Sequence, residues 1–259
     1  MKKLMYLAMA AVLLMACDPN GRVDVPGNDK KALNQSAAKA LTMIGGSATQ
    51  VDNELLKLGF TKTIMMQGAP ARFNQPAMAQ TTPEPPLEGE VYYLLNVPSK
   101  FLVTRGEERR DVISEIVDSK HAGIVIAALY GDNKLQQFNG SVFANADIKG
   151  VNNLYVGLSN AMYAGLPSKA ERLSWSGFIG QSGETRYEQR ADFEKALASF
   201  EAGEASEGSI FLDESKKVYY SIAWYAPDSE KRKSFEKEGV LPFCEGIFSV
   251  SLPDGYEID

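Results

Sequence analysis

The stretch 209–226, SIFLDESKKVYYSIAWYA, contains two runs of apolar and aromatic residues separated by four polar residues. This pattern predicts a β-hairpin with strands at Ser209–Leu212 and Lys217–Ala226. Because side chains alternate between the faces of a strand, the longer strand has one apolar face and one mixed face. The apolar set, expected in the core, is Val218, Tyr220, Ile222, Trp224 and Ala226. The mixed set is Tyr219, Ser221, Ala223 and Tyr225.

Outward from this hairpin, the chain alternates between helical and extended patterns. Apolar residues at helical spacing predict helices near 35–44 and over 48–58, 107–119, 148–164, 188–202 and 229–237. Extended runs predict strands at 61–67, 90–97, 124–130, 135–144, 171–179 and 243–252. Hairpins with helices inserted between them indicate an α+β fold in which amphipathic helices pack on antiparallel sheets.

Three of the expected helices begin with residues that can cap a first turn. Ser47-Ala48-Thr49-Gln50 fits a capping box, in which the serine oxygen accepts a backbone N–H of the first turn. Asp147 is placed to cap the helix over 148–164. Thr185-Arg186-Tyr187-Glu188 predicts another capping box, before a helix that Gly203 closes.

The first sixteen residues have a composition of their own. Lys2 and Lys3 precede an unbroken apolar run of 13 residues, which is too short to span a bilayer and is typical of a signal peptide. The run ends in Leu14-Met15-Ala16-Cys17, which resembles the lipobox of bacterial lipoproteins. The resemblance covers residues 1–17 alone. It implies cleavage before Cys17, attachment of lipid to Cys17 and a lipid-anchored place in the cell envelope. The alternative is an ordinary secretory peptide in which Cys17 is incidental.

The segment after this signal is rich in proline, glycine and charge, and residues 17–34 are expected to form a flexible tether. Loss of Lys2 and Lys3 with residues 1–16 takes the formal net charge from −6 to −8. An acidic surface repels nucleic acid and anionic lipid. We therefore expect no nucleic-acid partner and contact with the membrane through the N-terminal lipid. Which membrane and which leaflet the lipid enters stays open.

The body is expected to divide into two α+β halves, residues 35–146 and 147–259. Five prolines between Pro70 and Pro86 predict a surface insertion at 68–88, either a tolerated loop or a partner-binding segment. The segments Lys134–Asp147 and Lys216–Asp228 share a lysine start, an aromatic middle and an aspartate end. This similarity suggests an internal duplication, with two similar half-domains as one possibility.

The mixed face of Lys217–Ala226 is the main candidate for a binding surface. If the neighbouring strands lie beside it, the face gains further aromatic and polar side chains. The residues expected there are Tyr219, Tyr225, Arg172, Phe178 and Phe243. Aromatic rings interleaved with polar groups suit a carbohydrate, a peptide or an envelope protein partner. The competing interpretation is that a helix or the other half of the chain covers this face.

No recognised catalytic motif occurs in the chain. His121 is the only histidine, and its position after a helix suggests an interaction with that helix end. Cys244 falls on an apolar strand face and is expected to be a buried, inert thiol. With so few histidine and cysteine ligands we expect no metal site and no cofactor. The function predicted is a non-catalytic, ligand- or partner-binding lipoprotein; the alternative is an envelope hydrolase that uses an Asp/Glu pair.

Overall fold

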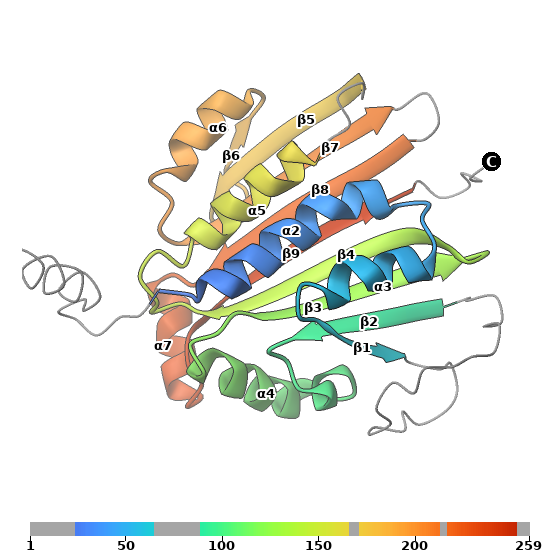
Figure 1. Cartoon of the computed structure of the whole chain (residues 1–259). Helices are drawn as coiled ribbons and strands as arrows, with labels where there is room; N and C mark the ends of the chain where they lie inside the picture. The colour runs from blue at the N-terminus through green and yellow to red at the C-terminus, as the bar shows by residue number, and fades with distance from the viewer. Residues whose placement is uncertain (1–23, 65–88, 166–170, 213–216, 253–259) are drawn as a thin grey trace, which may run out of the picture.

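The computed structural model describes residues 24–64, 89–165, 171–212 and 217–252. Their strands form one sheet of nine strands in the order β1-β2-β3-β4-β9-β8-β7-β5-β6, and every neighbouring pair is antiparallel (Figure 1). The strands are β1 (Thr61–Ile64), β2 (Gly89–Leu95), β3 (Gly123–Gly131), β4 (Lys134–Asn145), β5 (Glu171–Gly180), β6 (Thr185–Tyr187), β7 (Gly203–Leu212), β8 (Lys217–Ala226) and β9 (Phe243–Ser251). The predicted α+β fold is confirmed.

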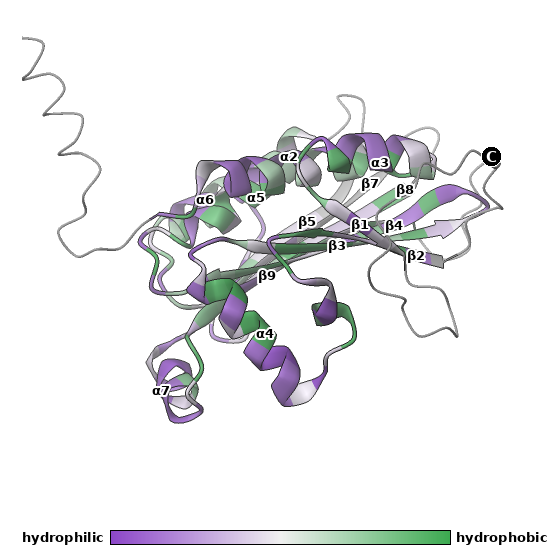
Figure 2. Cartoon of the chain, turned by 60° about the horizontal axis from the view of Figure 1, so that its bottom comes forward, coloured by the Kyte–Doolittle hydropathy of each residue, from purple (hydrophilic) through white to green (hydrophobic). Residues whose placement is uncertain are grey.

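The helices lie on both faces of the sheet, but unevenly. One face, the covered face, carries α2, α3, α5 and α6, whereas α4 and α7 lie on the other side, at one end (Figure 2). The helices are α2 (Gly27–Met43), α3 (Ala48–Leu56), α4 (Gly106–Asp118), α5 (Asn153–Ala164), α6 (Arg190–Leu197) and α7 (Ser229–Lys237), with a 3₁₀ turn η1 (Ser99–Leu102). The main core therefore lies between the sheet and four helices.

Strand alternation in β8 fixes which residues enter this core. The side chains expected in the core are all buried: Val218, Tyr220, Ile222, Trp224 and Ala226. Trp224 stacks on Tyr155 of α5 with ring centroids 6.3 Å apart. Gly246 makes room for this indole, because a Cβ there would lie 2.6 Å from it.

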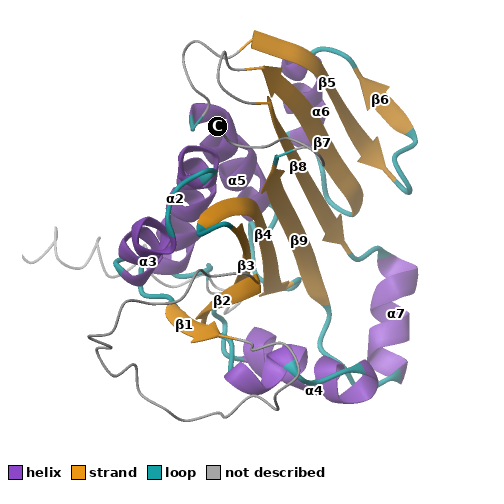
Figure 3. Cartoon of the chain, turned by 90° about the vertical axis from the view of Figure 1, so that its right-hand side faces the viewer, coloured by secondary structure: helices purple, strands orange, loops and turns teal. Residues whose placement is uncertain are grey.

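A smaller apolar cluster lies on the opposite face, under α4. Val112 and Ile116 of α4 pack with Val125 of β3 and with Phe143 of β4. Phe243 at the start of β9 adjoins the same cluster. This cluster fixes α4 over one end of the sheet, near α7, and no other α-helix of the described residues lies on that face (Figure 3).

The two halves predicted from the sequence share this single sheet. Residues 35–146 supply β1–β4, residues 147–259 supply β5–β9, and β4 pairs with β9 where the halves meet. The suggested duplication does not extend to the helices, because α4 packs on one face of the sheet and α6 on the other. The chain between Lys134 and Asp147 and that between Lys216 and Asp228 contain β4 and β8, which flank β9 on its two sides.

The expected tether, residues 17–34, is wrong in its second part. Helix α2 begins at Gly27, and Ala32 and Leu33 are buried in the core. Asp29 is buried as well, because it pairs with residues of other elements. Charged and polar residues in this segment suggested a tether, but Asp29 is buried in polar contacts, and Lys30 and Lys31 stay at least partly exposed on a docked helix. Predictions for residues 1–16, Cys17 and the insertion 68–88 concern residues outside the described ranges.

Of the three predicted caps, one is confirmed. The Ser47 oxygen accepts the N–H of Gln50, as expected. Asp147 pairs with Arg232 instead of capping, and α5 starts only at Asn153. Thr185–Tyr187 forms the edge strand β6, whose pairing with β5 outweighs a capping box.

A buried ion pair joins the sheet to the helices of the covered face. The side chain of Glu207 in β7 has no exposed surface, and Arg190 Nη1 of α6 lies 3.0 Å from its carboxylate. Ser159 Oγ of α5 and Trp175 Nε1 of β5 donate further hydrogen bonds to the same group. Burial nevertheless raises the pKa of Glu207 above that of an ordinary glutamate, against the opposing effect of these donors and of Arg190.

Candidate functional site

The mixed face of β8 is exposed, as the binding interpretation requires. Tyr219 and Tyr225 retain 38% and 41% of their surface, and Ile247 on β9 retains 38%. Helices α2, α3, α5 and α6 lie on the opposite side of the sheet. Helices α4 and α7 lie on the same side as these exposed residues, at one end of the sheet (Figures 2 and 3). We call this surface the open face.

A row of three side chains crosses the open face beside α7. Tyr225 of β8 pairs with Glu204 of β7 on one side and with Glu245 of β9 on the other. Directly paired residues in an antiparallel sheet share a face and lie about 4.5–5.5 Å apart. The Cα atoms of the two glutamates are therefore about 10 Å apart, with the tyrosine ring between them.

This row forms one wall of a pocket of about 550 Å³, which we call the end pocket. The opposite wall comes from α4 and α7, through Arg110, Lys231, Phe235 and Glu238. The turn after β5, with Gln181 and Ser182, and the start of β9, with Phe243, complete the lining. The volume lies within the range of pockets that hold small molecules.

The α7 wall is held in place by contacts that define its shape. Asp228 accepts the N–H of Lys231 and caps α7, as well as accepting a hydrogen bond from Gln181 Nε2. Phe235 packs on Phe243 with ring centroids 5.1 Å apart. Arg110 of α4 pairs with Glu238 at 2.7 Å, so the cation and the anion of this pair offset each other.

The two carboxylates of the row have different surroundings. Glu204 accepts a hydrogen bond from the Tyr225 hydroxyl. Glu245 is half-buried, and no residue that the structure describes donates a hydrogen bond to it or forms an ion pair with it. Burial raises the pKa of Glu245, and the nearby charge of Arg109 opposes this rise only in part. The pKa of Tyr225 is raised by burial and by both carboxylates.

The predicted site residues are only partly brought together. Tyr225 and Phe243 line the end pocket. Phe178 is half-buried on β5, and β7 lies between β5 and β8 in the sheet. The guanidinium of Arg186 lies 5.8 Å from the centre of the Phe178 ring. Tyr219 is six residues from Tyr225 along β8, about 20 Å at the usual strand rise. The strand register thus places Phe178 on the same face as Tyr219 and Tyr225, as expected, but these residues are spread along that face and do not all line one pocket. Arg172 belongs to β5, but its side chain is outside the described parts of the structure, as is Cys17.

Most of the remaining pocket lining was not predicted from the sequence. Glu204 was missed because the strand was expected to start only at Ser209, since Gly203–Gly208 is poor in β-branched and aromatic residues, yet β7 starts at Gly203. The alternation of Glu204, Ser206 and Gly208 could have extended the strand backwards. The short helix Ser229–Lys237 was predicted correctly, but its position over the sheet depends on contacts between distant residues.

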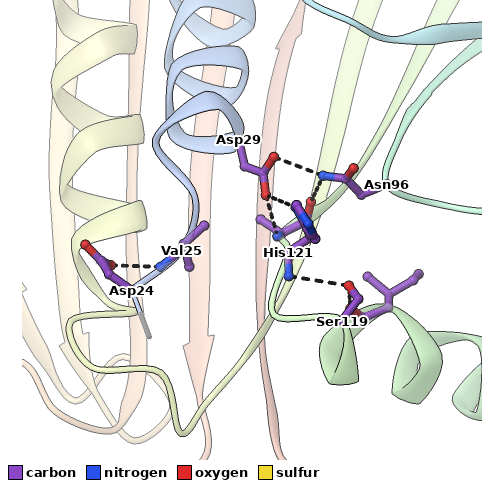
Figure 4. Close-up of polar contacts among 8 residues, drawn as sticks. Asp24, Val25, Asp29, Asn96, Ser119 and His121 are labelled. Carbon is purple, nitrogen blue, oxygen red and sulfur yellow. Dashed lines mark hydrogen bonds and ion pairs between the residues drawn. The ribbon is translucent and has the colours of Figure 1, made fainter. Parts of the chain in front are cut away.

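His121 belongs to a separate cluster away from the end pocket. Its Nδ1 lies 3.0 Å from Asp29 Oδ2, and Asp29 also accepts hydrogen bonds from the Ala122 N–H and from Asn96 Nδ2 (Figure 4). The expected interaction of the imidazole with the C-terminal end of α4 is wrong, because the ring contacts Asp29 in the first turn of α2 instead. No serine or cysteine side chain among residues 24–64, 89–165, 171–212 and 217–252 hydrogen-bonds to the ring, so the cluster provides no nucleophile.

Cys244 is a buried free thiol on the covered face, as predicted. Burial raises its pKa to about 12, so the thiol stays protonated near neutral pH. Within the described ranges, no three histidine, cysteine, aspartate or glutamate side chains converge as a metal site would require. None of the helices in those ranges is both long and apolar enough to cross a bilayer.

Comparison of the chain with protein-family models, with curated proteins and with solved structures gives no match.

Proposed function

We propose that this chain is a lipid-anchored protein of the cell envelope that binds a small polar ligand in the end pocket without transforming it. The anchor part is supported by the basic start, the apolar run and Leu14-Met15-Ala16-Cys17. The binding part is supported above all by the row Glu204–Tyr225–Glu245, which presents an exposed ring between two carboxylates in a pocket. A carbohydrate or the end of an envelope peptide is the kind of partner that such a wall accepts.

The position of the pocket fits an anchored protein. The start of α2 and helix α7 lie at the same end of the sheet (Figures 1 and 2). Six residues lie between Cys17 and Asp24, so this segment spans at most about 25 Å. A lipid on Cys17 would keep the end pocket close to the membrane surface, which favours a ligand found there.

Two measurements test this proposal. Mass spectrometry of the native protein should show a chain that starts at a lipidated Cys17; an unmodified Cys17 contradicts the anchor.

For binding, full-length protein in detergent is mixed with trialanine, maltotriose and tri-N-acetylchitotriose in saturation-transfer NMR. We expect at least one to bind the wild type and Tyr219→Ala but not Tyr225→Ala. Binding of none, or equal binding by Tyr225→Ala, contradicts the site.

A hydrolase remains the second candidate, because the pocket wall holds two carboxylates and one of them has a raised pKa. The raised pKa of Glu245 suits a general acid, and the carboxylate of Glu204 lies across the Tyr225 ring from it. Their Cα separation of about 10 Å is compatible with a pair that acts on either side of a glycosidic bond. Cleavage of tri-N-acetylchitotriose that Glu245→Gln abolishes would favour this candidate over simple binding.

A further inference from the structure

The end pocket has an acidic sheet wall and a helix wall that carries charges of both signs. Its sheet wall carries the carboxylates of Glu204 and Glu245, on either side of the Tyr225 ring. Its helix wall carries Lys231, which lies 5.2 Å from the Phe235 ring and forms no ion pair with the residues that the structure describes. The remaining charges are already engaged: Arg110 pairs with Glu238, and Asp228 caps α7.

The sheet wall lacks one charge-compensating partner. A half-buried carboxylate without a donor has lost part of its hydration without gaining a hydrogen bond in return. Glu245 is in this state, and Arg109, whose charge partly offsets it, lies over the Phe101 ring at 4.3 Å. A positively charged nitrogen from a ligand would supply the missing partner. The neighbouring ring of Tyr225 would attract the same cation through its face.

We propose that the end pocket binds a zwitterionic ligand, such as a short peptide, with its ammonium group between Glu204 and Glu245 over Tyr225 and its anionic end toward Lys231. This inference rests on the proposed function and narrows it, because a neutral carbohydrate would not use the two carboxylates of the sheet wall or the ammonium group of Lys231. The ammonium end makes the stronger contacts, since two carboxylates and a ring surround it, whereas Lys231 is exposed.

Three peptides of equal length test the assignment by isothermal titration of the full-length protein in detergent. Trialanine carries both charges, N-acetyl-trialanine lacks the ammonium group and trialanine amide lacks the carboxylate. We expect acetylation to weaken binding about tenfold or more, in line with the worth of a charge-assisted hydrogen bond, and amidation to weaken it by a smaller factor. Equal affinity for trialanine and its acetylated form overturns the assignment.

Charge-neutralising substitutions in the protein test the same contact that the modified peptides test. Glu245→Gln should weaken trialanine binding about tenfold or more and leave binding of the acetylated peptide unchanged. Glu236→Gln, an exposed residue of α7 outside the pocket lining, is the control and should bind trialanine like the wild type. A Glu245→Gln protein that binds trialanine normally contradicts the proposal.

Acidification gives an independent readout. The charged groups around the ammonium position are Glu204, Glu245, Arg109, Arg110, Lys231, Asp228 and Glu238. Since Glu245 takes up a proton at a higher pH than an ordinary carboxyl group, affinity for trialanine should fall as pH is lowered toward 5, before ordinary carboxyl groups titrate. Glu245→Gln should remove this fall. Affinity that does not depend on pH overturns the role of Glu245.

Maltotriose separates failure of this inference from failure of the proposed function. If maltotriose binds in a way that Tyr225→Ala abolishes while trialanine does not bind, the pocket is a ligand site of another class. If neither probe binds, both the inference and the binding function are wrong.

Discussion

Replacement of Arg190 by methionine tests whether the buried pair with Glu207 is needed for stability. Arg190 keeps 14% of its side-chain surface and Glu207 none, so the carboxylate would be left inside the core with hydrogen bonds from Ser159 and Trp175 alone. Removal of one partner of a buried pair destabilises a protein by about 3–5 kcal/mol. For a chain of this size, that corresponds to a fall in Tm of between about 6 and 20 °C.

The pH dependence follows from the direction of the Glu207 pKa. Burial raises this pKa in the folded protein, so the folded state holds its proton at pH values where the unfolded chain has lost it. The contribution of Glu207 to stability is therefore fully present below the ordinary glutamate pKa and is lost as pH rises through the folded value. Arg190→Met raises that value further, so the destabilisation should be largest near pH 7.5 and smaller near pH 5.5.

Urea unfolding followed by far-UV circular dichroism measures these effects at both pH values. Arg186→Met is the matched control, because its ion pair with Glu188 is exposed and should contribute less than about 1 kcal/mol. The double variant Arg190→Met/Glu207→Met should recover most of the lost stability, since no charge then stays buried. A loss below about 1 kcal/mol in Arg190→Met, or a loss that grows on acidification, would refute the reasoning.

Three further predictions concern packing, the docking of α2 and the thiol. Gly140→Ala should lower the free energy of unfolding by about 1–3 kcal/mol in urea titrations, because its Cβ would lie 2.0 Å from the Phe248 ring; Gly208→Ala, with only the Tyr220 carbonyl at 3.6 Å, should change it little. Asp29→Ala removes the acceptor for Ala122, Asn96 and His121 and should speed hydrogen exchange of the Ala122 amide and of the first turn of α2, whereas unchanged exchange would show that the contact does not hold the helix. With Cys17 lipidated as proposed, Ellman's reagent at pH 8 should modify no thiol in the folded protein and Cys244 alone after unfolding; a rapid reaction in the folded state would contradict the burial of Cys244.

Local patterns in the sequence predicted the elements whose own residues determine them. The alternation in β8 predicted both its core set and its exposed set, and Ser47 predicted the start of α3. Where a partner far along the chain decides the outcome, prediction failed. Asp147 pairs with Arg232 instead of capping, and Thr185–Tyr187 becomes a strand because β5 is available beside it.

The candidate site shows the same division. Tyr225 could be named from strand alternation alone, but Glu204 and Glu245 join it only through the register of three strands. The α7 wall depends on a helix that folds back over the sheet, and no short-range pattern reports where a helix docks. The predicted set therefore contained the ring and one neighbour, Phe243, and missed the charges around them.

If the proposed lipid anchor holds the chain at Cys17, the Asp29 cluster has a mechanical consequence. Tension along residues 17–24 would enter the folded body at the first turn of α2. There, one carboxylate links that turn to Asn96 after β2 and to Ala122 before β3. The force would be distributed over hydrogen bonds to segments that are distant in sequence. Detachment of α2 would therefore require several hydrogen bonds to break together, whereas a helix without these contacts could unfold one turn at a time.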